Sequence, residues 1–117
     1  MNFQQFLDGC FQRHWVREGP LDAYVRRSVR YLGKWYMALD IANVSVRPRS
    51  KGKGHFKKFI LRVEEAAQKQ GRIVFVESVG PTVAKWLPKH GYQQEENSDN
   101  FYKEFPPKRK GDKNAKG

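Results

Sequence analysis

The most constraining feature of this chain is a basic, glycine-containing loop that joins an apolar run to a helical pattern. Residues 46–54 read Val-Arg-Pro-Arg-Ser-Lys-Gly-Lys-Gly; they follow an apolar run over 35–46 and precede a helical pattern that begins at His55. The first N–H groups of a helix have no intrahelical partner and lie at the positive end of its dipole. A strand that enters a helix through such a loop presents these groups, with several basic side chains, to a phosphate. The loop therefore predicts a phosphate-binding site.

The glycine spacing excludes the two commonest phosphate-binding loops. A P-loop has four residues between its glycines and Lys-Ser/Thr after the second, and a dinucleotide-binding loop has three spaced glycines. Arg49, Gly52 and Gly54 instead match the pattern Arg/Gln-x-x-Gly-x-Gly/Ala, and here the chain resembles the GNAT N-acyltransferase superfamily. Residues 44–48 also have that superfamily's form, apolar-x-Val-x-Pro. The other interpretation is a basic turn that only caps a helix.

The resemblance implies both a fold and a cofactor. The fold is of the α+β (α/β) class, a GNAT-like acyl-CoA N-acyltransferase fold with a mixed central sheet, a β-α-β crossover, a bulged strand and a C-terminal hairpin. The cofactor is acetyl-CoA, with its pyrophosphate on the glycine loop, its pantetheine arm beside the bulged strand and a backbone N–H near Val44 as oxyanion donor. The implied cofactor-binding residues are Val44, Val46, Arg49, Ser50, Lys51, Gly52, Lys53, Gly54 and His55.

A change of phase within the apolar run predicts a β-bulge. Apolar side chains occupy odd positions over 35–41 and even positions over 44–46. Successive side chains of a strand point to opposite faces, so an extra residue is needed to keep both sets on one face. We therefore predict a bulge near Ala42 and Asn43, and the resemblance independently implies one there.

Apolar residues at helical spacing predict two N-terminal helices before this strand. The first covers 3–15 and places Cys10 in its apolar stripe, hence in the core. The second begins at Gly19-Pro20 and ends at Gly33. Its outer face, either solvated or a site for an anionic substrate or nucleic acid, carries Arg26, Arg27 and Arg30. The superfamily has several strands before its phosphate loop, so the front of the fold is expected to be abbreviated.

The second half of the chain predicts a crossover and a closing hairpin. The helix after the loop has an apolar face and an outer face that includes Glu64, and the next strand is apolar throughout, as in a parallel strand buried on both faces. The predicted elements are a helix over 55–70, a strand over 73–76, a short helix from Pro81, and a hairpin of 92–95 with 101–105.

Composition indicates the kind of partner. The chain has 117 residues, a net charge of +11 and a pI of about 10.0, which favours polyanions: coenzyme A, nucleic acid or an acidic protein surface. We expect one domain over 1–105 and a disordered basic tail over 106–117, either an electrostatic tether or a solubilising end. No apolar run has membrane-spanning length, and one cysteine cannot form an internal disulfide, so we predict a cytoplasmic protein without a membrane partner.

Two carboxylates, Asp40 and Glu77, are candidates for the general base that acylation of an amine needs. An amine of pKa ~10.4 is neutral in about one molecule in 10³ at neutral pH, so a base must assist. Asp40 lies at an offset where some superfamily members carry such a base; alternatively it pairs with an arginine of the second predicted helix. Glu77, ending the next strand, is the other candidate. Leu87 stands where the superfamily's second motif, which 84–92 resembles, usually has an acid tyrosine, so the candidate acids are Ser78, Tyr92 and Tyr102.

We therefore predict an N-acetyltransferase that moves an acetyl group from acetyl-CoA to an amine of a protein, nucleic acid or small molecule by direct attack. The alternative is a non-catalytic module for nucleic-acid binding or protein interaction on the same scaffold, which the charge and Leu87 favour. Against it, the aromatic residues lie in the predicted core stripes and not among the basic residues. The histidines are dispersed and have no metal-ligand spacing.

Overall fold

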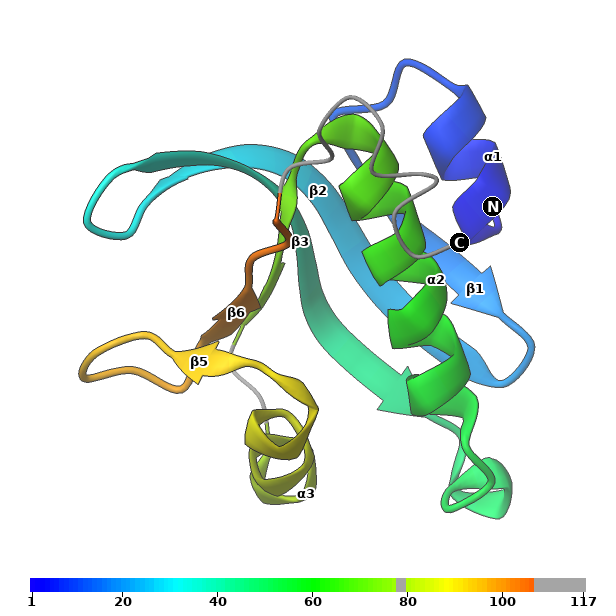
Figure 1. The fold of residues 1–117 in the computed structure, drawn as a ribbon. Helices are drawn as coiled ribbons and strands as arrows, with labels where there is room; N and C mark the ends of the chain where they lie inside the picture. Colours follow the sequence, from blue (N-terminus) through cyan, green and yellow to red (C-terminus); the bar gives the residue numbers. More distant parts are fainter. Residues whose placement is uncertain (78–79, 107–117) are drawn as a thin grey trace, which may run out of the picture.

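The centre of the molecule is a six-stranded mixed sheet with strand order β1-β2-β3-β4-β6-β5 (Figure 1). The computed structural model describes residues 1–77 and 80–106. β3 and β4 are parallel, and the other neighbouring strands are antiparallel. The predicted mixed α+β class is confirmed. The strands are β1 (Arg13–Glu18), β2 (Leu21–Tyr31), β3 (Trp35–Val46), β4 (Ile73–Val76), β5 (Gln93–Gln94) and β6 (Phe101–Lys103); the helices are α1 (Phe3–Asp8), α2 (His55–Gln70) and α3 (Pro81–Trp86), with short 3-10 turns η1 (Pro48–Ser50) and η2 (Pro88–His90).

Helices α1 and α2 cover one face of the sheet (Figure 1). They enclose the main core, whose fully buried members include Phe6, Ile41, Ile60 and Val63. Each such side chain contributes about 1.5–3 kcal/mol when it leaves water. Packing of α2 against this core fixes its position, and with it the position of the loop that leads from β3 into α2.

The β3-α2-β4 crossover agrees with the prediction. α2 spans His55–Gln70 and ends at Gly71, and all four residues of β4 are buried. One assignment is wrong, because Glu64 is buried (8% exposed) and not on the outer face. Its carboxylate accepts a hydrogen bond from the Tyr92 hydroxyl (2.7 Å) and pairs with Lys103 (3.5 Å), which compensates its burial.

The substitution Tyr92→Phe tests this buried contact. It removes the hydroxyl that Glu64 needs, so we expect the free energy of unfolding to fall by about 1–3 kcal/mol in urea denaturation. Burial, and then the hydrogen bond and charge of Glu64, raise the pKa of Tyr92 above its ordinary value of 10.0. The resulting stabilisation is complete below pH 10.0 and is lost as the pH rises further, because the unfolded chain then releases the proton first. The stability difference between the two proteins should therefore shrink above that pH, and a constant difference would contradict the contact.

The predicted N-terminal helices are largely wrong. The first helix ends at Asp8, so Cys10 is exposed and not in the core. Strands β1 and β2 replace the rest, joined by a two-residue turn at Gly19 and Pro20, where Gly19 has a left-handed φ of 61°. The apolar residues at positions 21, 25 and 29 are four apart, a spacing that fits both a helix and a strand. Periodicity alone could not separate the two.

As a strand, β2 divides the predicted arginine face. Arg26 and Arg30 point to the face without α1 and α2, where they meet Asp40. Arg27 points to the helical side and donates to the backbone carbonyls of Leu7 (3.3 Å) and Phe11. The three arginines therefore do not form one binding surface.

The predicted bulge is confirmed at Asn43. Tyr24 is paired with Ala42 and Asp22 with Ser45, so β3 has an extra residue in this interval. Asn43 adopts a left-handed conformation with φ 52°, which Asn tolerates better than most residues. The bulge redirects the last residues of β3, which border the candidate site.

The closing hairpin of β5 and β6 is also confirmed. None of the helices in the described residues combines the length and apolar character that a membrane crossing requires. Residues 107–117 of the predicted tail lie outside the described residues, and the division into a domain and a tail stays a prediction.

Candidate functional site

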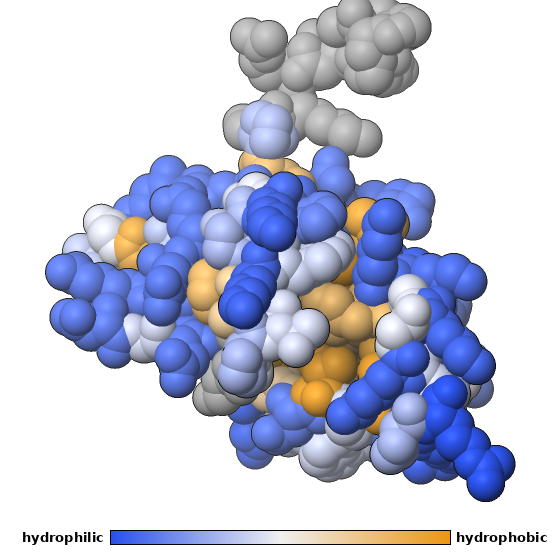
Figure 2. Space-filling model, turned by 90° about the horizontal axis from the view of Figure 1, so that it is seen from below, coloured by the Kyte–Doolittle hydropathy of each residue, from blue (hydrophilic) through white to orange (hydrophobic). Residues whose placement is uncertain are grey.

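A groove of about 550 Å³ lies between the end of β3 and helix α3. Seen from below the view of Figure 1, this end of the molecule has an apolar floor surrounded by hydrophilic residues (Figure 2). The rings of Phe56 on α2 and Trp86 on α3 meet edge to face at 5.5 Å and close one side. The apolar residues that line the groove are Val44, Val46, Phe56, Val83 and Trp86.

The groove exists because β3 continues past β4. The parallel pairing ends at Ile41 with Val76, followed by a hydrogen bond from the Glu77 N–H to the Ile41 carbonyl (2.9 Å). β3 then runs on to Val46, paired with β2 on its other side. After the bulge, the β4-side edge of residues 42–46 has no partner strand in the described part of the chain. Its backbone groups can therefore pair with an extended ligand.

The glycine loop forms the polar end of the groove. Gly52 and Gly54 have left-handed φ angles of 79° and 80°. Gly54 is the N-cap residue of α2 and supplies no side-chain cap, so the first turn of the helix is open at its positive end. The next residues, His55, Phe56 and Lys57, line the groove. This arrangement suits a phosphate group at the start of α2.

Seven of the nine predicted cofactor-binding residues line this groove: Val44, Val46, Ser50, Lys51, Gly52, Gly54 and His55. The other two, Arg49 and Lys53, are exposed in the same loop but do not line it. Sequence reasoning missed Ser45 on β3, Phe56 and Lys57 at the start of α2, and the opposite wall, which is formed by residues 80–83 and Trp86. The helical pattern from Pro81 showed that a helix follows β4, but not that its first turns pack across the loop.

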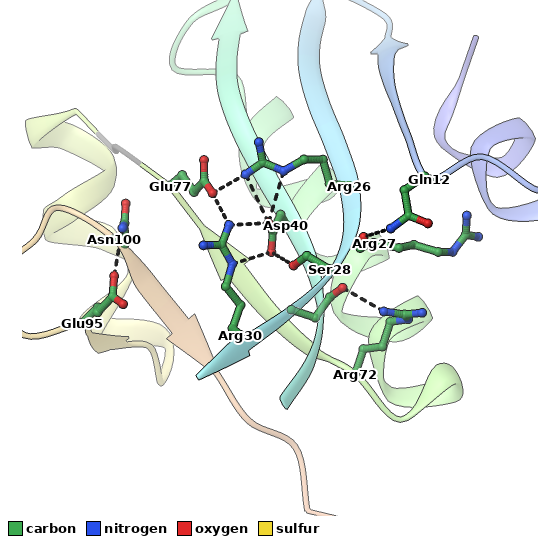
Figure 3. Close-up of polar contacts among 11 residues, drawn as sticks. Gln12, Arg26, Arg27, Ser28, Arg30, Asp40, Arg72, Glu77, Glu95 and Asn100 are labelled. Atoms are coloured by element: carbon green, nitrogen blue, oxygen red, sulfur yellow. Dashed lines mark hydrogen bonds and ion pairs between the residues drawn. The ribbon is translucent and has the colours of Figure 1, made fainter. Parts of the chain in front are cut away.

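A network of two arginines and two carboxylates lies on the face of the sheet opposite α2 (Figure 3). Asp40 is completely buried and accepts hydrogen bonds from Ser28 (2.8 Å), from Arg26 (3.2 and 3.3 Å) and from Arg30. Burial disfavours the charge of Arg30, but hydrogen bonds and charge from Asp40 and Glu77 outweigh it and raise the pKa of Arg30. Asp40 thus pairs directly with arginines, as the alternative interpretation of the sequence has it, although these arginines lie on a strand and not on a helix.

Glu77 occupies the exposed rim of the same network. Its Oε2 atom pairs with both Arg26 and Arg30, and its side chain is 22% exposed, whereas that of Asp40 is 0% exposed. Among the described residues, none donates a hydrogen bond to its Oε1 atom. Glu77 is therefore the carboxylate of this pair that a ligand in solvent can reach.

The two candidate acids that the structure describes, Tyr92 and Tyr102, do not line the groove, and neither does Leu87. Leu87 is fully buried in the core, and Tyr92 is held by Glu64. Tyr102 is half-buried on β6, where its hydroxyl faces Gln93 (3.3 Å). Ser78 lies outside the described residues.

Comparison with known proteins identifies the fold. No family model and no curated protein matches the sequence. The solved structures that resemble it include AtaT complexed with acetyl-methionyl-tRNAfMet (TM-score 0.61, 12% identity, 74% of this chain), the KacTA–DNA complex (0.56, 15%, 75%) and nourseothricin acetyltransferase (0.55, 14%, 74%). The matches cover 61%, 62% and 58% of those chains, so this chain spans less than two thirds of their length.

A GNAT-family protein from Desulfovibrio desulfuricans matches 85% of this chain with a TM-score of 0.54 and 14% identity. At such identities the likeness concerns the fold and not the reaction. The β3-α2-β4 crossover contains the glycine loop and residues 44–48, on which the predicted resemblance rests. This protein has the GNAT-like fold of the acetyltransferases that it resembles.

Proposed function

We propose that this protein is an N-acetyltransferase that uses acetyl-CoA to acetylate an amine. The observation that carries the proposal is the groove, in which an apolar floor and a free strand edge lead to an uncapped helix start with a basic glycine loop. A ligand with an extended, largely apolar arm and a pyrophosphate would fit this groove, with the arm along the strand edge and the pyrophosphate at the helix start. The acetyltransferases among the solved structures with this fold support the same assignment.

The residues present fit the two chemically different parts of coenzyme A. The pyrophosphate would lie on the N–H groups at the start of α2, near Lys51 and His55, which line the groove. The pantetheine arm would lie along Val44–Val46, whose strand edge has no partner there among the described residues. Arg49 and Lys53, exposed in the loop, would add positive potential around the phosphates.

When bound, acetyl-CoA would supply a thioester whose acyl carbon forms a bond to the amine nitrogen as its C–S bond breaks, so that CoA leaves as a thiolate. The chain must then remove a proton from that amine, and Glu77 is the better candidate of the two carboxylates because its side chain is 22% exposed, whereas that of Asp40 is fully buried. Asp40 would act through Arg26 and Arg30, by holding the two guanidinium groups against Glu77. A backbone N–H near Val44 would face the acyl oxygen.

Thermal unfolding with different nucleotides tests the assignment. At a concentration of about 100 times its Kd, acetyl-CoA should stabilise the fold by about 2.7 kcal/mol and raise Tm on the order of 10 °C. ATP offers phosphates and adenine without a pantetheine arm and should have a much smaller effect. Lys51→Glu should reduce the acetyl-CoA shift, while Lys34→Glu, remote in the β2–β3 turn, should not. Equal shifts with acetyl-CoA and ATP would argue for a general polyanion site.

Release of free CoA in the presence of a panel of amines would then identify the acceptor class.

A second candidate function is nucleic-acid binding. The sequence argued against it because the aromatic residues were expected in the core and not among the basic residues, but the fold places one aromatic residue between arginines. Residues 13–17 form a strand, so Arg13, Trp15 and Arg17, which are two positions apart, lie on the same face of the sheet, the one opposite the helices. Trp15 is 51% exposed and its ring lies 5.4 Å from that of Tyr24 on β2. Aromatic rings between arginines are what single-stranded nucleic acid binds, by base stacking and phosphate contacts. Neighbours of this fold solved with tRNA and DNA support this candidate.

Trp15→Ala separates this second candidate from acetyl-CoA binding. Loss of one stacked base should weaken binding of a single-stranded RNA by about 10-fold, because such stacking contributes about 1–3 kcal/mol. Fluorescence anisotropy would measure the RNA affinity and calorimetry the acetyl-CoA affinity, which should not change. Leu61→Ala, equally exposed on α2, is the control. If both variants bind RNA like the wild type, the face formed by β1 and β2 does not contact it.

A further inference from the structure

The far end of the β2–β3 hairpin carries four apolar side chains that the helices do not cover. Val29 is paired with Met37 and Tyr31 with Trp35. Their exposed fractions are 61%, 51%, 60% and 70% respectively. Figure 1 shows this hairpin projecting beyond the C-terminal end of α2. We refer to these four residues as the hairpin patch.

The hairpin patch continues the core face of the sheet. Along β2 and β3 the preceding pairs on this face are Arg27 with Leu39 and Val25 with Ile41, and the three apolar members of these pairs are fully buried under the helices. Two aromatic side chains alone bury about 150–250 Å² each when covered. An exposed apolar surface of several hundred Å² on a small domain is typical of an interaction site.

A pair of arginines without carboxylate partners borders the hairpin patch. Arg27 precedes Val29 on the same face, and its contacts are the Phe6 ring (4.8 Å) and backbone carbonyls. Arg72, after α2, donates to the carbonyl of Ala38 (3.0 Å). Burial, and then the charge of Arg27, lower the pKa of Arg72. Within residues 1–77 and 80–106, neither guanidinium group forms an ion pair with a carboxylate.

We propose that the hairpin patch and these two arginines dock an acidic, amphipathic segment of a partner protein. Apolar side chains of the segment would cover the two cross-strand pairs, and its carboxylates would lie at Arg27 and Arg72, where they relieve the repulsion between like charges. The proposal is independent of acetyl transfer.

Two other occupants agree less well with the same surface. A second copy of the chain would bring another +11 of charge and another pair of arginines against this one. A nucleic acid would meet two aliphatic side chains, Val29 and Met37, which offer no ring for base stacking.

Selection of peptides tests the proposal. A phage-displayed library of random linear peptides would be selected on the full chain, and the enriched peptides measured by fluorescence anisotropy. We expect enrichment of acidic residues interspersed with aromatic or aliphatic ones. Trp35→Ser and Met37→Ser should each weaken binding of such a peptide by about 10-fold or more, as at interface hot spots. Leu61→Ser, which removes an equally exposed apolar side chain from α2, should leave binding unchanged.

The charge component has a test that does not disturb the fold. Replacing glutamate by glutamine within the peptide should weaken its binding by about 10-fold and flatten the salt dependence, and the effect should shrink in Arg72→Gln. Binding that is equal in wild type and Trp35→Ser, or that is independent of the peptide carboxylates, overturns the proposal. So does a concentration-dependent dimer in sedimentation that Trp35→Ser abolishes, or loss of RNA binding in Trp35→Ser, since another molecule would then occupy the hairpin patch.

Discussion

Replacing Gly52 or Gly54 by valine is expected to weaken CoA binding by about 100-fold or more and to leave the protein folded. Both glycines have left-handed φ angles, 79° and 80°, and no atom lies within 4 Å of a Cβ placed at either position. The cost is therefore conformational, about 1–3 kcal/mol for a residue forced into this region, and a β-branched side chain is among the least tolerant. The loop would rearrange, and the N–H groups at the start of α2 would no longer be presented together. Isothermal titration calorimetry with CoA measures the loss.

Gly33→Val provides a matched control for this experiment. Gly33 has φ 89°, and a Cβ at this position would likewise have no atom within 4 Å, but Gly33 lies in the β2–β3 turn, away from the groove. The variant should show a similar decrease in Tm with unchanged CoA affinity. A folded Gly52→Val or Gly54→Val protein that binds CoA like the wild type would contradict the location of the pyrophosphate.

Asp40→Asn is expected to lower the free energy of unfolding by about 3–5 kcal/mol. The substitution removes a completely buried charge that compensates Arg26 and Arg30, and it leaves two guanidinium groups with one carboxylate. Loss of one member of a buried ion-pair network costs this much because the remaining charges stay desolvated. Urea denaturation at neutral pH gives the value.

Two control variants locate this effect in the buried network. Glu77→Gln removes the partly exposed carboxylate and keeps Asp40, so it should cost less, and Asp22→Asn breaks an exposed pair with Arg17 that should contribute less than about 1 kcal/mol. The loss of stability is expected whether Asp40 is the base or a positioning residue, and the pH dependence of turnover separates the two roles. If Asp40 is the base, Asp40→Asn should lower turnover by roughly 10²-fold at neutral pH, and this loss should shrink as the pH rises; an equal loss at every pH indicates a positioning role.

The crossover and its loop could be predicted because each has a local signal. The two glycines, the helical repeat after His55 and the phase change before Asn43 determine local backbone geometry, and the structure has all three features. The mixed sheet follows, since a strand, a helix and a second apolar strand form a parallel pair. Seven of the nine predicted cofactor residues line one groove for the same reason.

The N-terminal part could not be predicted because its signal is ambiguous. Spacing of four residues on β2 fits a helix as well as a strand, and only the pairing with β1 and β3 decides between them. The contacts that depend on this pairing were also missed. Examples are the separation of Arg27 from Arg26 and the exposure of Trp15 among arginines. The wall formed by Trp86 depends on tertiary packing that no spacing in the sequence expresses.

Because β3 separates from β4 at the groove, the two sides of the groove can differ in their stability against local unfolding. The groove lies at the boundary between the antiparallel strands β1–β3 and the unit of β4, α3, β5 and β6, which the chain reaches only after α2. The strands β1–β3 are joined by short turns and can form early in folding, whereas the parallel pairing of β4 closes a longer loop and comes later. We therefore expect β4, α3, β5 and β6 to open locally at a lower free energy than β1–β3. A ligand that spans the boundary would suppress that opening, so amide exchange in β4 and β6 should slow most when CoA binds.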